Sequence, residues 1–212
     1  MRDKVIFATG NEGKMKEIRL LLADVDVELL SLKDVGLLGD TEESGTTFAE
    51  NALIKARTIA RQVKLAVLAD DSGLEIDFLH KEPGIYSARY MGEDTSYHIK
   101  NRELLRRLSG VPDELRTARF VCAIAAVFPG GREWLAEGVM EGRIGYEEKG
   151  ENGFGYDPIF YIPEYGLTGA ELDAEQKNRI SHRGKALEEM KNILIAEGIW
   201  KPGSEKAAGE NE

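Results

Sequence analysis

Apolar and polar positions along the start of the chain predict strands separated by helices. Residues 5–8 form a short apolar run rich in β-formers, and a turn follows it. The next apolar positions recur at helical spacing, namely Met15, Ile18, Leu21 and Leu22. A continuous apolar run indicates a buried strand, whereas a spacing of three and four indicates one face of a helix. Residues 5–22 are therefore predicted to form strand, loop and helix.

A second helix is predicted over residues 47–62. Thr47 and Glu50 have the spacing of a capping box, in which both side chains accept from free backbone N–H groups of the first turn. The stripe expected to pack consists of Ala52, Ala56, Ile59 and Ala60. Residues 65–69 then follow as a strand and residues 74–79 as another.

The second half of the chain predicts a further helix and a long hairpin. The helix covers 95–108, a strand over 119–128 ends at the letters PGG, and residues 134–140 are expected to pair with it. Thr168 and Glu171 resemble a second capping box, and Ser181 can cap the last helix. This order predicts an α/β fold with a mixed sheet.

Composition describes an ordinary globular protein. The chain has 212 residues, of which 42% are hydrophobic and 31% charged. That length predicts a single domain over residues 1–201, and the small, polar and acidic residues 202–212 are expected to form a disordered tail. The formal charge of -10 argues against a broad surface for duplex nucleic acid, which would need a basic face. Nucleic acid is therefore not an expected partner.

Targeting and redox signals favour the cytoplasm. Cys122 is the only cysteine, and it lies in an apolar run, which is typical of a small buried side chain rather than a nucleophile. No signal peptide is expected before the first strand, and no segment approaches the ~20 apolar residues that span a bilayer. The expected localisation is cytoplasmic, without a membrane partner.

Two adjacent carboxylates end the most apolar of the early strands. Asp70 and Asp71 follow residues 65–69, and an acidic loop at 40–45 carries Glu42 and Glu43. Carboxylates at strand ends are the ligands that Mg²⁺ prefers, and Mg²⁺ commonly accompanies a phosphate substrate. In the competing interpretations the glutamates are merely solvated, and Asp71 holds an Asx turn in the letters DSG.

A possible phosphate loop lies between the first strand and the first helix. Its letters, TGNEGK, cover residues 9–14 and combine two glycines, a helix N-terminus and Lys14. Free backbone N–H groups and a positive side chain favour an anion there. The glycines are three apart rather than five, so this is not a Walker A loop. A plain turn with a surface lysine explains the same letters.

Two later segments could meet a base. The glycine-rich loop at 150–160 carries Phe154, whose ring could stack on any base, although it could equally anchor the loop to the core. His182 and Arg183 follow Ser181, and positive charges in the first turn oppose the helix dipole, which suggests a ligand. The alternative is two exposed residues at a helix start.

Taken together, these segments resemble one family of enzymes. It is the non-standard purine nucleoside triphosphate pyrophosphatases, also called inosine or xanthosine triphosphate pyrophosphatases. The resemblance rests on six stretches in order, namely ATGNEGKMKEI, TFAENALIKA, ADDSGLEID, PGIYSARY, GFGYDPIF and KNRISHRGKAL. It implies Mg²⁺-dependent hydrolysis of dITP, ITP and XTP to the nucleoside monophosphate and pyrophosphate, which keeps these nucleotides out of DNA and RNA. It also implies an elongated mixed sheet flanked by helices, two lobes with a substrate cleft between them, and a homodimer.

The same resemblance assigns roles at the phosphate end. The triphosphate would be held by Thr9, Gly10, Asn11, Glu12, Gly13 and Lys14, with Asn11 and Lys14 as principal contacts. Lys55 would add a second positive charge. Asp71 matches the catalytic acid, a metal ligand and general base, and Ser72 would contact the nucleotide. Asp70 is expected to support Asp71, by holding a lysine or by tuning protonation. The second metal ligand is Glu43 or Glu42, with Glu43 favoured.

At the base end the resemblance assigns a second set of residues, namely Phe154, Gly155, Tyr156, Asp157, Lys177, His182 and Arg183. Hypoxanthine and xanthine present a 6-keto acceptor where adenine presents a donor. Donors from the cationic members of this set would therefore favour the keto bases and leave a buried donor unpaired beside adenine. Two alternatives remain: the same fold acting on other modified nucleotides, and a nucleotide-binding regulator without hydrolysis.

Overall fold

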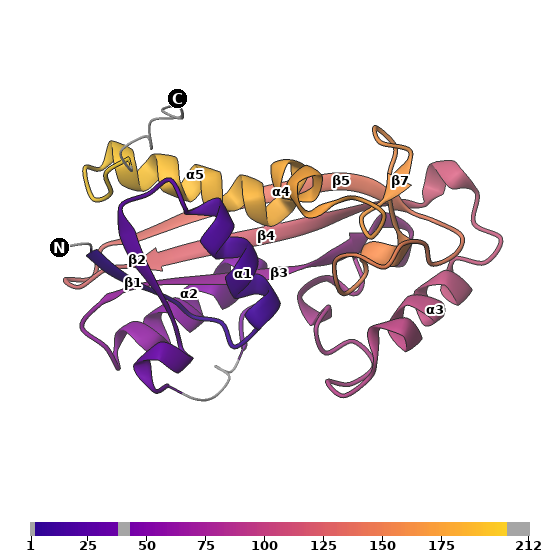
Figure 1. The fold of residues 1–212 in the computed structure, drawn as a ribbon. Coiled ribbons are helices and arrows are strands. Elements are labelled where there is room, and N and C mark those ends of the chain that lie inside the picture. Colours follow the sequence, from indigo (N-terminus) through magenta and orange to yellow (C-terminus); the bar gives the residue numbers. More distant parts are fainter. Residues whose placement is uncertain (1–2, 38–42, 203–212) are drawn as a thin grey trace, which may run out of the picture. The chain divides into compact units, whose positions relative to one another are not determined.

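The computed structural model describes residues 3–37 and 43–202. Over these ranges there are seven strands and five α-helices. Strands and helices alternate as far as β4, after which β5, β6 and β7 follow without an α-helix and α4 and α5 end the order (Figure 1). The strands are β1 (Asp3–Phe7), β2 (Val27–Ser31), β3 (Ala66–Ile76), β4 (Thr117–Val127), β5 (Glu133–Ile144), β6 (Phe160–Ile162) and β7 (Leu167–Thr168). The helices are α1 (Glu12–Leu21), α2 (Phe48–Ala60), α3 (Tyr97–Arg107), α4 (Ala174–Ile180) and α5 (His182–Ala196). The 3₁₀ turns are η1 (Lys33–Val35), η2 (Asp77–Leu79), η3 (Gly84–Tyr86), η4 (Asp113–Leu115) and η5 (Asp157–Ile159).

The described strands form one sheet in the order β2-β1-β3-β4-β5-β6-β7. Strand β1 is parallel to both β2 and β3, whereas β6 is antiparallel to both β5 and β7. The α/β class and the mixed sheet predicted from the sequence are thus confirmed. Strands β4 and β5 are neighbours joined by a tight turn, in which the backbone N–H of Phe128 donates to the carbonyl of Arg132 over 3.0 Å. The predicted hairpin is confirmed as well.

The chain divides into two compact units, each with its own core. Among the described residues, the first contains 3–37, 43–70, 123–136 and 186–202. In the first unit, the buried side chains of β1, Val5, Ile6 and Phe7, share the core with Met15 and Ile18 of α1. An exposed bidentate ion pair joins Arg57 of α2 to Glu133, with N–O distances of 2.8 and 2.6 Å.

The second unit consists of residues 71–122 and 137–185. Its apolar cluster includes Leu74, Leu104, Phe120, Ile144 and Phe160, which come from β3, α3, β4, β5 and β6. Each of these elements supplies alternate or helically spaced residues to the cluster, as the periodicity of a half-buried strand or helix requires.

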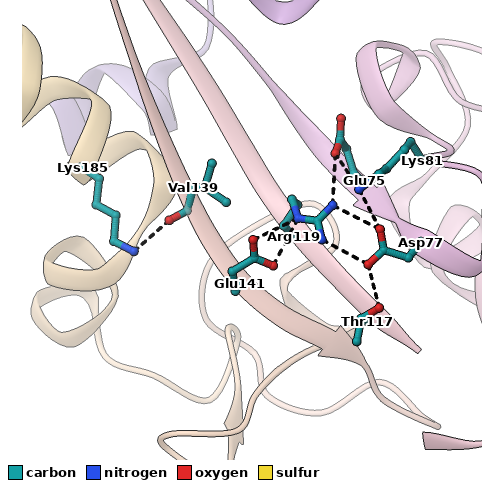
Figure 2. A network of polar contacts seen from close by, with 8 residues as sticks. All are labelled: Glu75, Asp77, Lys81, Thr117, Arg119, Val139, Glu141 and Lys185. Atoms are coloured by element: carbon teal, nitrogen blue, oxygen red, sulfur yellow. Dashed lines mark hydrogen bonds and ion pairs between the residues drawn. The ribbon is translucent and has the colours of Figure 1, made fainter. Parts of the chain in front are cut away.

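A charged network crosses the strands of the second unit (Figure 2). Arg119 of β4 bonds both carboxylate oxygens of Asp77 over 3.1 Å and reaches Glu141 of β5 over 3.0 Å. Burial raises the pKa of the neighbouring Glu75 above its usual range. Opposite charges on adjacent strands support strand pairing. Beside this network, Lys185 at the start of α5 donates to the carbonyl of Val139 over 2.8 Å.

Two local predictions are wrong. Residues 65–69 and 74–79 are not separate strands, because β3 runs without interruption from Ala66 to Ile76 and includes Asp70 and Asp71. An Asx turn at Asp71 is therefore excluded. Thr168 does not cap a helix either, because it pairs with Tyr161 in β7 and its hydroxyl donates to the carbonyl of Lys149.

The other caps follow from the side chains at each helix start. Thr47 accepts from the N–H of Glu50, as predicted, but the Glu50 carboxylate bonds the N–H and hydroxyl of Thr46. These bonds hold the pKa of Glu50 below its usual range. A reciprocal capping box heads α4, where Asp173 and Gln176 bond each other's backbone N–H.

The remaining global expectations concern the membrane and the tail. None of the helices in the described ranges combines the length and apolar character that a bilayer crossing requires. Apart from its first residue, the tail expected at 202–212 lies outside the described residues, as does Glu42.

Candidate active site

The predicted phosphate loop and Asp70 belong to the same edge of the sheet. Strands β1 and β3 run parallel, with Phe7 opposite Leu68, and the N–H of Ala8 donates to the carbonyl of Leu68 over 2.7 Å. Loops that leave the carboxyl ends of neighbouring parallel strands start side by side. The turn at residues 9–14 therefore begins beside the end of the apolar part of β3, where Asp70 follows Ala69.

The loop is shaped by its own side chains. Asn11 is the N-cap of α1, and its Oδ1 accepts from the backbone N–H of Lys14 over 3.1 Å. The hydroxyl of Thr9 accepts from the N–H of Asn11 over 3.2 Å. A Cβ at Gly13 would lie 3.1 Å from Asn11 Oδ1, so Gly13 leaves room for this cap, whereas a Cβ at Gly10 would meet nothing within 4 Å. The cap presents the first turn of α1 as a site suited to an anion.

Two lysines converge on Asp70. The ammonium of Lys14 contacts Asp70 Oδ2 over 2.9 Å, and that of Lys55 donates to the Asp70 carbonyl over 3.1 Å. The Asp70 side chain is 1% exposed, so its charge is compensated by Lys14, as burial of a carboxylate requires. The expectation that Asp70 holds a lysine is confirmed. Glu12 lies apart from this group and pairs with Lys33 at the surface.

The acidic loop also meets this group. Glu43 forms an ion pair with Lys55, and both side chains are largely buried. Gly45, which follows Glu43 and Ser44, is fixed to α2 because Asn51 Oδ1 accepts from its N–H over 2.8 Å. A Cβ at Gly45 would come within 2.7 Å of the Asn51 and Glu50 side chains, so only glycine fits this close approach.

The donor chemistry suits a hard cation. Glu43, Asp70 and Asp71 offer carboxylate oxygens, which Mg²⁺ prefers. Within residues 3–37 and 43–202, however, no group of three acidic, histidine or cysteine side chains is gathered closely enough to hold a metal ion. Lysines contact Glu43 and Asp70, and Asp71 Oδ1 accepts from the N–H of Ser72 over 3.1 Å. These residues fit the metal by chemistry, because carboxylate oxygens are its preferred ligands.

Phe154 stands on a tightly built loop in the second unit. One oxygen of the buried Asp157 accepts from the N–H of Phe154 over 2.8 Å and from the ammonium of Lys177 over 2.6 Å. Gly153 has a φ of +73°, and a Cβ there would lie 2.3 Å from the Asp157 carboxylate. The Phe154 ring remains 44% exposed. The loop therefore presents an aromatic ring and fixes the backbone beneath it.

Cations lie beside that ring. The Lys177 ammonium is 4.9 Å from the centre of the Phe154 ring, and the Arg183 guanidinium is 5.7 Å from it. Arg183 also donates to the Ser72 hydroxyl over 3.3 Å. The structure thus brings together Phe154, Asp157, Lys177, Arg183 and Ser72, which the sequence spreads over more than a hundred residues.

Tyr156 has a different position from its neighbours. It is 3% exposed, belongs to the apolar cluster of the second unit, and donates its hydroxyl to the Ser87 carbonyl over 2.7 Å. Burial raises the pKa of its phenol above the usual range. Its ring meets that of Tyr97 edge to face at 5.2 Å. The side chain therefore anchors the loop to the core.

His182 and Arg183 are buried, so the alternative of two exposed residues is wrong. They are 7% and 2% exposed, and the His182 imidazole stacks on Phe120 at 4.9 Å. Ser181 is the C-cap of α4 and also caps the N-terminus of α5. Its hydroxyl accepts from the N–H of Gly184 over 2.9 Å. The predicted cap of the last helix is confirmed.

Gly184 allows this junction to close. A Cβ there would lie 2.2 Å from the Asn178 carbonyl and 3.0 Å from the Ser181 hydroxyl. We expect Gly184→Ala to lower the free energy of unfolding by about 2 kcal/mol, because the junction must open to admit the methyl group. Chemical denaturation of the two proteins measures this, and an unchanged midpoint would contradict it. Gly198→Ala, whose Cβ would meet nothing within 4 Å, is the control for losing a glycine, although its φ of +69° adds strain of its own.

Comparison with known proteins decides the family. The model of the Ham1 family matches residues 5–193, which is most of the chain. The chain belongs to the Ham1 family. Among its relatives, a dITP/XTP pyrophosphatase of Desulforamulus reducens is 51% identical over 191 residues, covering 90% of this chain and 95% of that protein.

Solved structures of the family have the same fold. The Ham1 protein of Staphylococcus aureus superposes with a TM-score of 0.84 at 39% identity, covering 92% of this chain and 100% of that one. A nucleoside-triphosphatase and dITP/XTP pyrophosphatase of Mycobacterium abscessus superposes with a TM-score of 0.72 at 43% identity, covering 88% and 98%. The family resemblance inferred from the six sequence stretches is confirmed.

Sequence reasoning overlooked several residues that shape the Phe154 loop. Ser87, Lys100 and Asn101 are all at least 95% buried. The Ser87 carbonyl accepts from the Tyr156 hydroxyl, Lys100 donates to the carbonyl of Ala88, and Asn101 donates to that of Gly155. A signal was present for the helix residues. Lys100 lies four and eight positions before the buried Leu104 and Leu108, so a polar residue interrupts the apolar stripe of α3.

Proposed function

We propose that this chain hydrolyses dITP, ITP and XTP to the nucleoside monophosphate and pyrophosphate, in the cytoplasm and as a homodimer. The names of its relatives support the substrate class. One observation carries the chemistry: Lys14 and Lys55 meet the buried Asp70 beside the capped N-terminus of α1. Paired lysines and free helix N–H groups suit the polyphosphate of a nucleotide.

The reaction follows from these groups. Asp71 accepts a proton from water, whose oxygen forms a bond to the α-phosphorus while the bond from that phosphorus to the bridging oxygen of the β-phosphate breaks. The electron pair leaves with pyrophosphate. Lys14, Lys55 and the first turn of α1 stabilise the negative charge that builds up on this leaving group. Mg²⁺ held by Asp71 and Glu43, or by Glu42 in place of Glu43, supplies further positive charge when bound.

Base selection is assigned to the residues around Phe154. The exposed ring offers a stacking surface, and Lys177, Arg183 and His182 supply donors for a 6-keto oxygen. Adenine presents an amino group at that position, so its N–H donors would face the N–H donors of these side chains and neither would be paired. Tyr156 contributes through its backbone and its anchoring hydroxyl. The cleft expected between two lobes stays a prediction.

A nucleotide panel tests the proposal. The protein is given dITP, XTP, ITP, ATP, GTP and dTTP, with Mg²⁺ and with EDTA, and pyrophosphate and orthophosphate are measured separately. We expect pyrophosphate from the first three at rates at least tenfold above those for ATP and dTTP, and none with EDTA. GTP has the same 6-keto oxygen, so a low rate with GTP would come from its 2-amino group. Preference for a pyrimidine would favour the modified-nucleotide alternative. Tight dITP binding without turnover at any Mg²⁺ concentration would favour the regulator.

A further inference from the structure

We propose that Asn101 is a positioning residue that holds the Phe154 loop ready for a base. This rests on the proposed function, because the loop is taken as the base platform. Asn101 lies on α3 and is 1% exposed, so it cannot form part of the platform surface. Its Nδ2 donates to the carbonyl of Gly155 over 3.3 Å, the residue that follows Phe154.

The loop is held at three successive residues. Asp157 bonds the N–H of Phe154, Tyr156 bonds the Ser87 carbonyl through its hydroxyl, and Gly155 is held through its carbonyl by Asn101. Gly155 has a φ of +72°, a left-handed conformation that glycine adopts without penalty and leaves readily. The Asn101 bond therefore restrains a glycine, whose backbone is freer to change conformation than that of any other residue type.

A second contact orients Asn101. Its Nδ2 also donates to Glu148 Oε1 over 2.8 Å, and Glu148 Oε2 lies 2.5 Å from Nδ1 of the exposed His98. Two acceptors around Nδ2 fix the orientation of the amide, because the reversed amide would point its oxygen at a carboxylate and a carbonyl. The chain of contacts runs from His98 through Glu148 and Asn101 to Gly155.

The oxygen of the Asn101 amide indicates that this residue serves function rather than stability. Asn101 Oδ1 is buried and has no hydrogen-bond partner in the described part of the chain. A buried acceptor without a donor is unfavourable, so the site would be better filled by an apolar side chain if packing were its only purpose. Keeping an amide here is explained by its two donated bonds, of which the one to Gly155 reaches the platform.

The test replaces Asn101 with leucine, which has nearly the same shape and neither donor nor acceptor. Asn101→Leu removes the unsatisfied oxygen but also takes the donor from the Gly155 carbonyl, so two opposite effects on stability offset each other and the midpoint of denaturation should change little. We expect amide hydrogen exchange of residues 149–157 to become at least tenfold faster in the free protein. For dITP we expect KM to rise about tenfold while kcat stays within a factor of two, since stacking on the ring is the interaction that weakens.

Matched variants separate positioning from folding. Glu148→Gln keeps an oxygen that accepts from Asn101 and should leave exchange and KM near wild type, whereas Glu148→Leu should behave as Asn101→Leu does. Arg106→Ala, on an exposed position of the same helix, is the control for changes in α3.

The outcomes remain distinguishable from failure of the proposed function. Unchanged exchange of residues 149–157 in Asn101→Leu overturns the positioning role, whatever the enzyme hydrolyses. A loss of about tenfold in kcat for dITP, with KM unchanged in Asn101→Leu, overturns it too. If the wild-type protein hydrolyses none of the nucleotides while the exchange result holds, the loop restraint stands and the assignment of the loop to a base is what fails.

Discussion

Asp71→Asn is expected to lower kcat for dITP hydrolysis by about a thousandfold, with little change in folding. The substitution removes the carboxylate that accepts the proton of the attacking water, and a positioned general base contributes about 10²–10⁴ in rate. Asparagine keeps an oxygen that can accept from the N–H of Ser72, as Asp71 does. Steady-state release of pyrophosphate at saturating Mg²⁺ measures the effect.

Asp77→Asn is the matched control for this experiment. Asp77 directly follows β3, and its carboxylate belongs to the Arg119 network and is one-third exposed. Its removal should leave kcat within about a factor of two, because surface ion pairs of this kind contribute little. Turnover above a tenth of wild type in Asp71→Asn would remove Asp71 from the role of base.

Lys14→Met is expected to lower both activity and stability. Losing one charge that stabilises the leaving group should reduce kcat/KM by about 10²-fold. The variant also leaves Asp70 buried without its ammonium partner at 2.9 Å. Breaking a fully buried pair costs about 3–5 kcal/mol, and because Lys14 is one-fifth exposed we expect about 2 kcal/mol in the free energy of unfolding.

The double variant Lys14→Met with Asp70→Asn separates the two effects. Removing the charge of the buried Asp70 carboxylate should restore most of the lost stability, while activity stays low because the lysine is still missing. Lys33→Met tests an exposed lysine that pairs with Glu12 and should change neither quantity measurably. Recovery of activity in the double variant would show that Lys14 acts only by neutralising Asp70.

The sequence predicted the parts of this molecule that depend on local pattern. The helix at 47–62, the last helix with its Ser181 cap, and the hairpin at 119–140 all follow from periodicity and capping, and the structure contains each of them. The break predicted after residue 69 failed because two carboxylates and a glycine interrupt an apolar run without ending the strand. Strand propensity is overridden there by pairing within the sheet.

The candidate site was predicted less completely, for a physical reason. Motifs singled out Lys14, Asp70 and Phe154 as candidates, and a lysine was expected at Asp70, but the sequence did not say which one. Contacts between residues as distant as Ser72 and Arg183 depend on how the strands and helices pack. Asn101 escaped notice because its part depends on a backbone carbonyl, which has no signature in the letters of the sequence.

The junction at Ser181 limits how this chain can change in length. One residue ends α4 and caps α5, so no loop separates Lys177 from Arg183. Each residue added to a helix turns the later residues by roughly 100° about the helix axis and advances them by about 1.5 Å. Inserting one amino acid between His182 and Arg183, in the first turn of α5, would therefore rotate Arg183 away from Phe154 and Ser72. Helix geometry therefore fixes the number of residues between Lys177 and Arg183, whereas exposed turns elsewhere can accept inserted residues.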